Sequence, residues 1–527
     1  MEKKATGKIS LEEFFYFGFF ILLSVTKGLG FYDGQKLFLL LVIPAFLCVL
    51  CKILITPYTR RQWIIVTLLL LLTGFVYFQS GEKGILFTMF MVLGMKNISI
   101  HKLMRTGLVV WSLCSVVLSV FSFFRLEHTI YRVHQKMGLG HIFRWSLGFT
   151  HPNILHITYF ILCVFIVYEL ADHYGFKHFL LLSIGNALVF FYSVSFTGFG
   201  IVMILLAAGL YVRFRPRFCL WEKAVVNLAL PLFIMVSFVL PLIMAAQYAK
   251  QQVSPLMHSL DQLFNTRIVL ASHFLLPEFI TPFGARIASL GLPSGSLDSS
   301  YIWTFINYGF VPFFLLMAAY LILVADYSRK QKTREVVIIV CFLMAGFTEQ
   351  LLFNTSFKNI SLFFLGELLF RQKEGEKEYG LFPGLRREVG LPALRFMPEL
   401  KKHLTGLGKS GRKQILSGIL AGAVFGMILC GVFYRAPKGY VVQRFYTDGL
   451  FETSVYPASA EDPAYEGYRI MNYVDADTPM QIVEGKAVAL ETARYYTGSA
   501  LIGGLCGFGL YTGYLCLRAR KKEMERL

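Results

Sequence analysis

The sequence has few charged residues for its length. Asp, Glu, Lys and Arg together make up 16% of its 527 residues, while hydrophobic residues make up 56%. The mean hydropathy is +0.58. A soluble globular protein of this size needs more polar surface, so the composition excludes that class and indicates a membrane protein.

Patterns that bind metal ions or form disulfides are also missing. The nine cysteines fall in apolar runs or in loops that we expect on the cytoplasmic side, where thiols stay reduced. None has metal-ligand spacing with a histidine partner, and His128, His134 and His141 fit no zinc motif. We therefore expect no metal ion, no cofactor and no outer disulfide.

The net charge of +19 does not indicate a nucleic-acid partner, because no basic patch is paired with a soluble recognition fold. Lys and Arg instead collect in alternate loops, as they do on the cytoplasmic side of membrane proteins. These loops are at 60–61, 96–105, 213–217, 329–334, 371–413 and 518–526. We expect a multi-pass protein of the cytoplasmic membrane with both termini in the cytoplasm and contacts to anionic lipids.

Runs of apolar residues long enough to cross a hydrocarbon core recur along almost the whole chain. We expect an all-α polytopic membrane protein with about fourteen spanning helices. The spans are expected at 14–29, 37–55, 63–78, 84–95, 108–124, 154–170, 179–192, 198–212, 224–246, 301–325, 336–352, 360–370, 415–434 and 496–517. No small-residue cleavage site follows the first run, so we interpret it as a retained helix.

The chain divides into four parts on these signals. A core at 1–372 holds about twelve helices and a large outer loop at 250–300. A basic cytoplasmic linker at 373–413 leads to a hairpin of two helices at 414–517, which encloses a small outer domain at 435–494. A basic cytoplasmic tail follows at 518–527. Glycines recur every four residues in both hairpin helices, which favours their close packing.

Two loops expected on the outer side carry cations against the usual bias. The loop at 125–150 has Arg125, Arg132, Lys136 and Arg144, and the loop at 250–300 has Lys250, Arg267 and Arg286. A guanidinium group binds two phosphate oxygens at once, so these loops indicate an anionic ligand such as a lipid pyrophosphate. The alternative is that the arginines reach toward lipid headgroups or pair with Asp261, Glu278 and Asp298.

Three stretches resemble the motifs of one bacterial family. The segment RWSLGFTHPN at 144–153 resembles a signature of capsular and O-antigen repeat-unit polymerases, of the O-antigen polymerase and ligase superfamily. NTRI at 265–268, PFG at 282–284 and LDSSY at 297–301, followed by Gly309, resemble that family's progression through its large outer loop. GFTE at 346–349 and Asn359 resemble its ending, so the resemblance covers about residues 1–372 in order.

The resemblance implies a membrane core similar to that of the glycosyltransferase C class. It implies an enzyme that joins undecaprenyl-pyrophosphate-linked oligosaccharide units into capsule, O-antigen or exopolysaccharide at the outer face, without a metal ion. Its partners would be the lipid-linked glycan, membrane lipids and a chain-length regulator or flippase. By architecture alone, the C-terminal hairpin resembles such regulators; the alternative is an accessory hairpin that stabilises the core.

The chemistry needs a base for the acceptor hydroxyl and cations for the leaving pyrophosphate. We assign Asp298 as the catalytic base or hydroxyl-orienting group, with capping of the tenth span as its equal alternative. Arg267 first, then Arg286, and also Arg144, are the candidate pyrophosphate ligands. His151 is a second candidate base, although a role in fixing its loop is favoured.

Four further residues complete the candidate site. Asn153 and Tyr301 are candidates for binding sugar, Asn153 by hydrogen bonds and Tyr301 by stacking. Asn307 supports the site, with satisfaction of the helix backbone as the alternative. Glu349 is costly inside an apolar span, so we expect it to be the buried partner of Arg144 or Arg267.

Two positions depart from the family, and two other functions stay open. Asp298 stands where related ligases have a histidine, which favours a polymerase over a ligase. Phe196 stands where an arginine is often found, so Arg144 or Arg286 would replace that phosphate contact. A flippase for the same lipid is the alternative from another class, but the chain has no internal repeat.

Overall fold

A computed structural model describes residues 7–124, 131–135, 141–264, 266–275, 279–286, 297–355, 357–371, 376–382, 388–391, 409–444, 463–473 and 480–524. Several residues singled out above lie outside these ranges: Arg125, His128, Lys136, Asn265 and Glu278, together with most of the linker.

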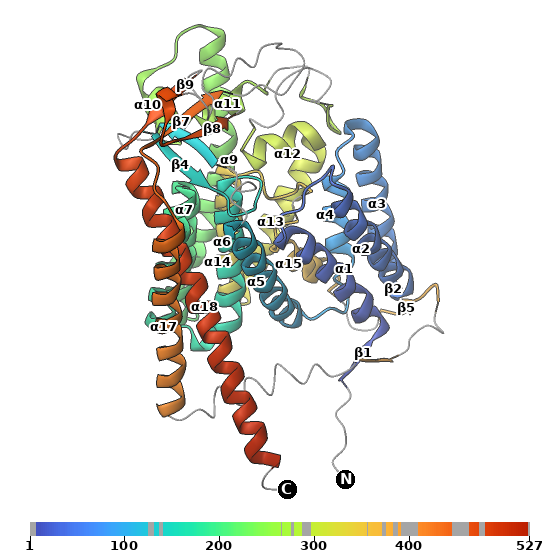
Figure 1. The fold of residues 1–527 in the computed structure, drawn as a ribbon. Coiled ribbons are helices and arrows are strands. Elements are labelled where there is room, and N and C mark those ends of the chain that lie inside the picture. Colours follow the sequence, from blue (N-terminus) through green and yellow to red (C-terminus); the bar gives the residue numbers. More distant parts are fainter. Residues whose placement is uncertain are drawn as a thin grey trace.

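Helices make up most of the described chain (Figure 1). The first eight are α1 (Leu11–Gly28), α2 (Lys36–Ile55), α3 (Arg60–Ser80), α4 (Gly84–Leu93), α5 (Ile100–Phe124), α6 (Pro152–Leu170), α7 (Phe176–Ser193) and α8 (Phe196–Phe214). The others are α9 (Leu220–Ala249), α10 (Pro255–Leu263), α11 (Arg267–Ser272), α12 (Ser300–Tyr308), α13 (Phe310–Arg329), α14 (Thr333–Thr348), α15 (Leu362–Leu369), α17 (Lys409–Phe433) and α18 (Lys486–Met524).

Short strands form four small sheets. The strands are β1 (Gly7–Ser10), β2 (Tyr58–Thr59), β3 (Tyr131–Gln135), β4 (His141–Trp145), β5 (Glu378–Tyr379), β6 (Glu388–Leu391), β7 (Gly439–Arg444), β8 (Tyr468–Tyr473) and β9 (Met480–Val483). β1 pairs with β6, β2 with β5 and β3 with β4, all antiparallel. β7 lies between β8, which is parallel to it, and the antiparallel β9.

The expectation of a helical multi-pass membrane protein is confirmed. Within the described ranges, nine helices are long and apolar enough to cross a membrane, namely α2, α3, α5, α6 with the turn that follows it, α7, α8, α9, α13 and most of α17. Many large apolar side chains on these helices are exposed, as in a lipid-facing surface.

Several predicted spans are wrong in detail. The span predicted at 301–325 is two helices, because α12 ends at Tyr308 and α13 begins at Phe310. Gly309 between them has φ +85°, and a Cβ there would clash with the backbone of Pro282 and Phe283. The span predicted at 360–370 contains only the eight-residue α15, whose length of ~12 Å is too short to cross a bilayer by itself.

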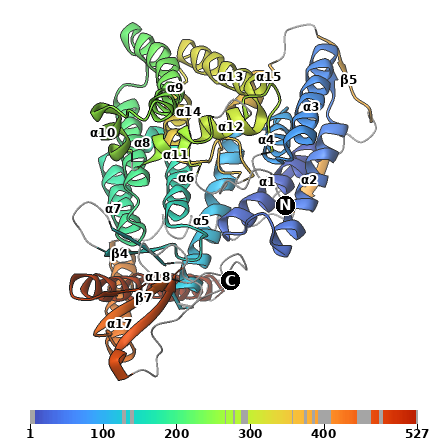
Figure 2. The same ribbon diagram turned by 90° about the horizontal axis from the view of Figure 1, so that it is seen from above.

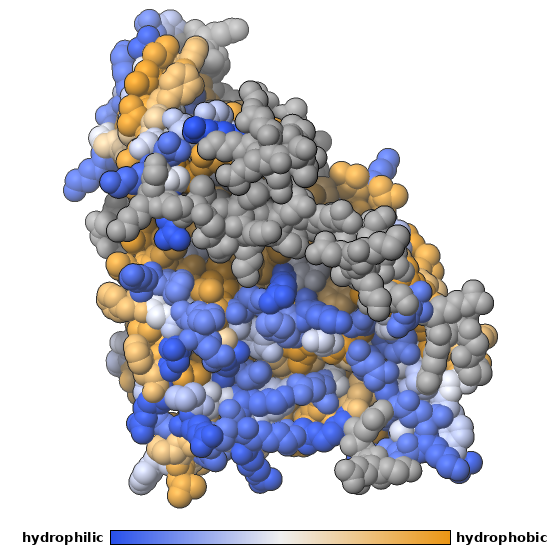
Figure 3. Space-filling model, turned by 90° about the horizontal axis from the view of Figure 1, so that it is seen from below, coloured by the Kyte–Doolittle hydropathy of each residue, from blue (hydrophilic) through white to orange (hydrophobic). Residues whose placement is uncertain are grey.

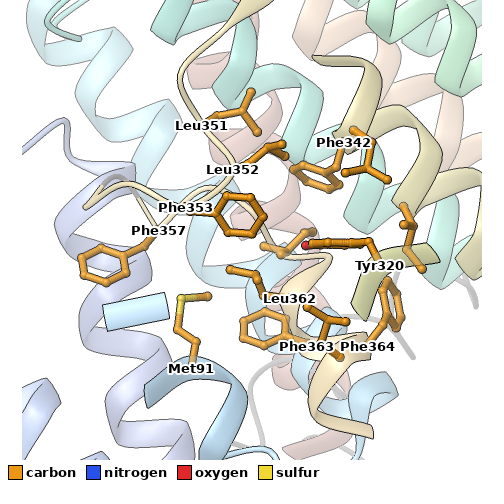
Figure 4. Packing of buried hydrophobic residues seen from close by; sticks show 14 of the residues in the cluster. Met91, Tyr320, Phe342, Leu351, Leu352, Phe353, Phe357, Leu362, Phe363 and Phe364 are labelled. Atoms are coloured by element: carbon orange, nitrogen blue, oxygen red, sulfur yellow. The ribbon is translucent and has the colours of Figure 1, made fainter. Parts of the chain in front are cut away.

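A buried segment without regular structure takes the place of the end of the span predicted at 336–352 and the start of the one predicted at 360–370. Residues 349–355 and 357–361 run through the apolar core between α14 and α15, with Leu351, Phe353 and Phe357 packed among core side chains (Figure 4). Non-helical backbone at membrane depth requires partners in the protein. Asn359 is one such partner, since its Nδ2 donates to the Leu352 carbonyl at 2.9 Å.

The C-terminal hairpin lies along one side of the bundle. α17 and α18 pack closely through glycines, because a Cβ at Gly422 would meet the Gly503 carbonyl and a Cβ at Gly426 the Ser499 carbonyl. Figure 2, viewed from above, places both helices beside β4 and away from α3. The predicted close packing of the hairpin is therefore present.

The bundle has two different ends. β4 and β7–β9 lie at one end, which we call the sheet end, whereas both termini lie at the other, the terminal end (Figure 1). Seen from below, the face at the terminal end carries many hydrophilic side chains (Figure 3).

Candidate functional site

A cluster of buried polar side chains lies where α14 ends. Its centre is Glu349, which directly follows α14 and is 12% exposed. One of its oxygens, Oε1, accepts from Asn153 Nδ2 at 2.9 Å, from Arg267 Nη2 at 3.0 Å and from Thr197 Oγ1 at 3.5 Å. Glu349 thus joins the starts of α6, α8 and α11, and the predicted pairing with Arg267 is present.

Arg267 connects this buried carboxylate to one that faces solvent. Its guanidinium is 8% exposed, and its Nε lies 3.3 Å from Asp298 Oδ2. The Asp298 side chain is 41% exposed, in contrast to Glu349. The N-cap position of α12 is occupied by Ser299, so Asp298 stands before the helix and beside Arg267. This arrangement leaves the Asp298 carboxylate accessible to a ligand.

Arg144 reaches the cluster from β4. Its Nη2 donates to Asn153 Oδ1 at 2.6 Å, and its Nε donates to the Ser193 carbonyl at 2.8 Å. Asn153 therefore bridges Arg144 and Glu349 through its two amide atoms. The three segments that carry Arg144, Arg267 and Glu349 are far apart in sequence, and the fold brings them together.

His151 fixes the start of α6. It is the N-cap residue, and its Nδ1 accepts from the Asn153 backbone N–H at 3.0 Å. Pro152 follows as the first helical residue, where a missing N–H costs nothing. The structure agrees with the favoured interpretation, in which His151 orders the loop that positions Asn153.

Ser300 holds the end of α14 against α12. Its hydroxyl donates to the Glu349 carbonyl at 2.6 Å and accepts from the Leu351 N–H at 2.9 Å. Ser300 belongs to the LDSSY motif at 297–301, but the sequence analysis predicted no role for this residue. A serine at the start of a helix is a common capping residue, so its partner on another helix was not visible in the sequence.

Three predicted site residues are placed elsewhere. Tyr301 is fully buried and its hydroxyl donates to the Leu343 carbonyl at 2.7 Å, so the prediction that its ring stacks on sugar is wrong. Asn307 is buried and its Nδ2 donates to the Trp303 carbonyl at 3.0 Å. It therefore satisfies the helix backbone, which was the alternative to a supporting role in the site. Arg286 lies against the end of α3, where its Nη2 donates to the Phe78 carbonyl at 3.3 Å.

The other departure from the family pattern is also visible. Phe196 begins α8 with an exposed side chain, while the next residue, Thr197, points to Glu349. Of the two arginines that would replace the missing contact, Arg144 is in the cluster.

The back of β4 is held by the C-terminal hairpin. Trp145 Nε1 donates to Glu491 Oε2 at 2.7 Å. Arg494 is fully buried, pairs with Glu491 at 2.5 Å and donates to the carbonyls of Phe143 and Phe191. We call Trp145, Glu491 and Arg494 the hairpin clamp. It holds the residues on both sides of Arg144. Sequence reasoning missed it because Glu491 and Arg494 were placed in the outer domain at 435–494.

The chemistry available in the cluster follows from its charges. Two guanidinium groups, on Arg144 and Arg267, stand beside two carboxylates, on Asp298 and Glu349. Exposed Asp298 is able to take a proton from a hydroxyl group, and the arginines are able to bind phosphate oxygens. No group of three or more His, Cys, Asp or Glu side chains suited to a metal ion is found among the described residues.

The fold and the cluster define a class, a helical multi-pass membrane protein with a buried polar site. No protein-family model, no curated protein and no solved structure matches the chain.

Proposed function

We propose that this protein is a glycosyltransferase that polymerises undecaprenyl-pyrophosphate-linked oligosaccharide units into a surface polysaccharide. The observation that carries the proposal is the bridge from Glu349 through Arg267 to half-exposed Asp298. Those residues lie in the stretches that resemble the polymerase motifs. Their meeting in one cluster supports the resemblance, and this support does not depend on the order of the motifs along the chain.

In the proposed reaction, a sugar hydroxyl of one lipid-linked unit attacks the anomeric carbon of another. Asp298 accepts the proton of that hydroxyl while a new carbon–oxygen bond forms. The bond from the anomeric carbon to the pyrophosphate oxygen breaks, and the lipid pyrophosphate leaves with the bonding electrons. Arg267 and Arg144 stabilise its charge. Glu349 and Asn153 keep both guanidinium groups in place.

The membrane arrangement is part of the proposal. We place the sheet end outside and the terminal end, with both termini, in the cytoplasm. The helices α1, α4, α14, α15 and α18, helped by the non-helical segments next to the shortest ones, bring the crossings to about fourteen. The core at 1–372 is then similar to that of the glycosyltransferase C class. The sheet of β7, β8 and β9 is the outer domain of the hairpin.

The partners follow from the same reaction. They are the lipid-linked glycan and membrane lipids, with a flippase supplying the substrate and a chain-length regulator acting on the product. No metal ion or cofactor takes part in the proposed step.

The first test replaces Arg267 by alanine in cells that lack the native gene. We expect long glycan chains to fall by about a hundredfold or more, because a transition-state donor is lost, with single lipid-linked units accumulating outside. Glycan ladders on gels and labelling of exposed units measure both. Lys177→Ala, which removes an exposed cation in the first turn of α7, is the matched control and keeps normal ladders.

Other outcomes separate the alternatives. Units that accumulate on the cytoplasmic side indicate a flippase. Normal chain lengths that are not attached to their final acceptor indicate a ligase. Normal ladders in Arg267→Ala, with the variant present in the membrane, contradict the site.

A further inference from the structure

Buried lysines near the terminal end are well paired. Lys52 is fully buried, and its Nζ donates to Thr56 Oγ1 at 2.6 Å and to the Lys96 carbonyl at 2.8 Å. Lys96 Nζ donates to Gln62 Oε1 at 2.6 Å and pairs with Glu378 at 2.8 Å. These contacts offset the cost of removing an ammonium group from water.

Two other buried lysines differ from these. Lys27 and Lys358 are each 7% exposed. Lys27 Nζ has one hydrogen bond, to the Phe31 carbonyl at 3.3 Å, and lies 4.5 Å from the centre of the Phe38 ring. The backbone carbonyl of Lys358 accepts from the Ile360 N–H, but its Nζ has no hydrogen bond and no ion pair with any residue that the structure describes. A buried ammonium group with so few partners indicates that the lysine binds a ligand, in contrast to a structural lysine such as Lys52.

The two lysines lie near one another. Lys27 Nζ is 5.8 Å from the centre of the ring of Phe357, the residue before Lys358. Phe357 has φ +52°, a backbone conformation that costs energy for a bulky residue and is often kept at functional sites. The two ammonium groups repel one another, and Lys358 is attracted to Glu349. The pair is thus electrostatically connected to the polar cluster.

The balance of charge shows why this pair matters. In the cluster, Arg144 and Arg267 are offset by Asp298 and Glu349, so those four groups carry no net charge in their ionised forms. In their ammonium forms, Lys27 and Lys358 add two positive charges. Asp33 also attracts Lys27, but it is partly exposed and pairs with Lys83 at 3.2 Å. Net positive charge beyond that of the cluster therefore comes from the two lysines.

We infer that Lys27 and Lys358 form an anion-binding site for the diphosphate group of a lipid substrate. An ammonium group binds phosphate as a compact point charge, and two of them match the charge of a diphosphate better than one. The anion site stands on the buried lysines alone. Its assignment to a lipid diphosphate rests on the proposed function, in which two such lipids meet in each reaction.

The test measures binding to the purified full-length protein in detergent. Inorganic pyrophosphate and farnesyl diphosphate are titrated against the wild type, Lys27→Met, Lys358→Met and the exposed control Lys177→Met. We expect each buried lysine variant to lose about tenfold or more in affinity for both probes, and the control to lose none. Methionine keeps the side chain long and apolar, so the ligand-free variants should melt at or above the wild-type temperature.

Each other result has a defined meaning. Unchanged pyrophosphate affinity in both methionine variants overturns the site, and so does a lower melting temperature without a change in affinity. Equal affinity for the two probes overturns the assignment to a lipid, whereas tighter binding of farnesyl diphosphate with the same lysine dependence supports it.

The two proposals fail separately. If Arg267→Ala keeps normal glycan ladders while pyrophosphate binding depends on Lys358, the proposed function is wrong and the anion site stands. If the ladders change as proposed while the methionine variants bind like the wild type, the anion site is wrong and the function stands.

Discussion

Two buried arginine–glutamate pairs lie on the two sides of β4, and they are built differently. Arg494 and Glu491 are three residues apart on α18, with their other contacts to Trp145 and to backbone carbonyls. Arg267 is in α11 and Glu349 follows α14, and the other contacts of these two side chains are to the side chains of Asp298, Asn153 and Thr197.

This difference separates a structural pair from a functional one. A carbonyl is an acceptor that cannot move away, so the hairpin clamp has a single arrangement. Side-chain partners leave alternatives, and Asp298 at 41% exposure is open to a substrate. A buried ion pair by itself is weak support for function. The exposed third member is what distinguishes the Arg267 pair.

The largest expected effect comes from replacing Asp298, the exposed partner of Arg267. We expect Asp298→Asn to lower polymerisation by roughly 100-fold to 10,000-fold, the usual contribution of a catalytic base, with little change in thermal stability. Chain synthesis from isolated lipid-linked units, measured against melting temperature, gives both values. A variant that is fully active shows that the open carboxylate is not the base, and the contrast between the two pairs then loses its functional meaning.

The second-largest effect is expected for the buried pair of Arg494 and Glu491. We expect Arg494→Met to destabilise the protein by about 3–5 kcal/mol, because Glu491 is left buried without its partner. Thermal unfolding in detergent measures this loss. The double variant Arg494→Met with Glu491→Leu should recover much of it, since no buried charge is then left unpaired. A double variant as unstable as the single one contradicts a purely structural pair.

The smallest effect is expected at Arg286. Its guanidinium lies beside the Phe78 carbonyl at the end of α3, and it is exposed. We expect Arg286→Ala to change glycan chain synthesis by less than about threefold, in line with weak surface contacts. A loss similar to that of Arg267→Ala would bring Arg286 back into the site and would show that the substrate reaches α3.

The sequence predicted more of the site than of the helix boundaries. Arg144 and Arg267 were singled out as cations against the topological bias, and Glu349 as a charge inside an apolar span. Asn153 and Asp298 were singled out in stretches that resemble the polymerase motifs. The fold joins all five. Hydropathy counts apolar residues, so it extended the span at 336–352 past the end of α14 and gave the short α15 a full span at 360–370. Residues 349–355 and 357–361 between these helices have no regular structure. Their backbone is satisfied instead by side chains such as Asn359 and Ser300, which an apolar count does not register.

Other errors have a similar origin. Arg286 and Tyr301 have the residue types expected at a sugar-phosphate site, but residue type does not tell which way a side chain points. The end of α12 was missed because Gly309 acts through contact with Pro282, a residue distant in the sequence. The hairpin clamp joins positions that are 346 residues apart, and no local pattern predicts such a pair.

That separation has a consequence for the order in which the protein matures. A chain enters the membrane from its N-terminus as the ribosome makes it. β4 with Arg144 is therefore in place long before α18, which brings Glu491 and Arg494, has been synthesised. Until translation is nearly finished, the strand lacks the contacts that hold it from behind. A nascent or truncated chain would then have the residues of the site without their final alignment.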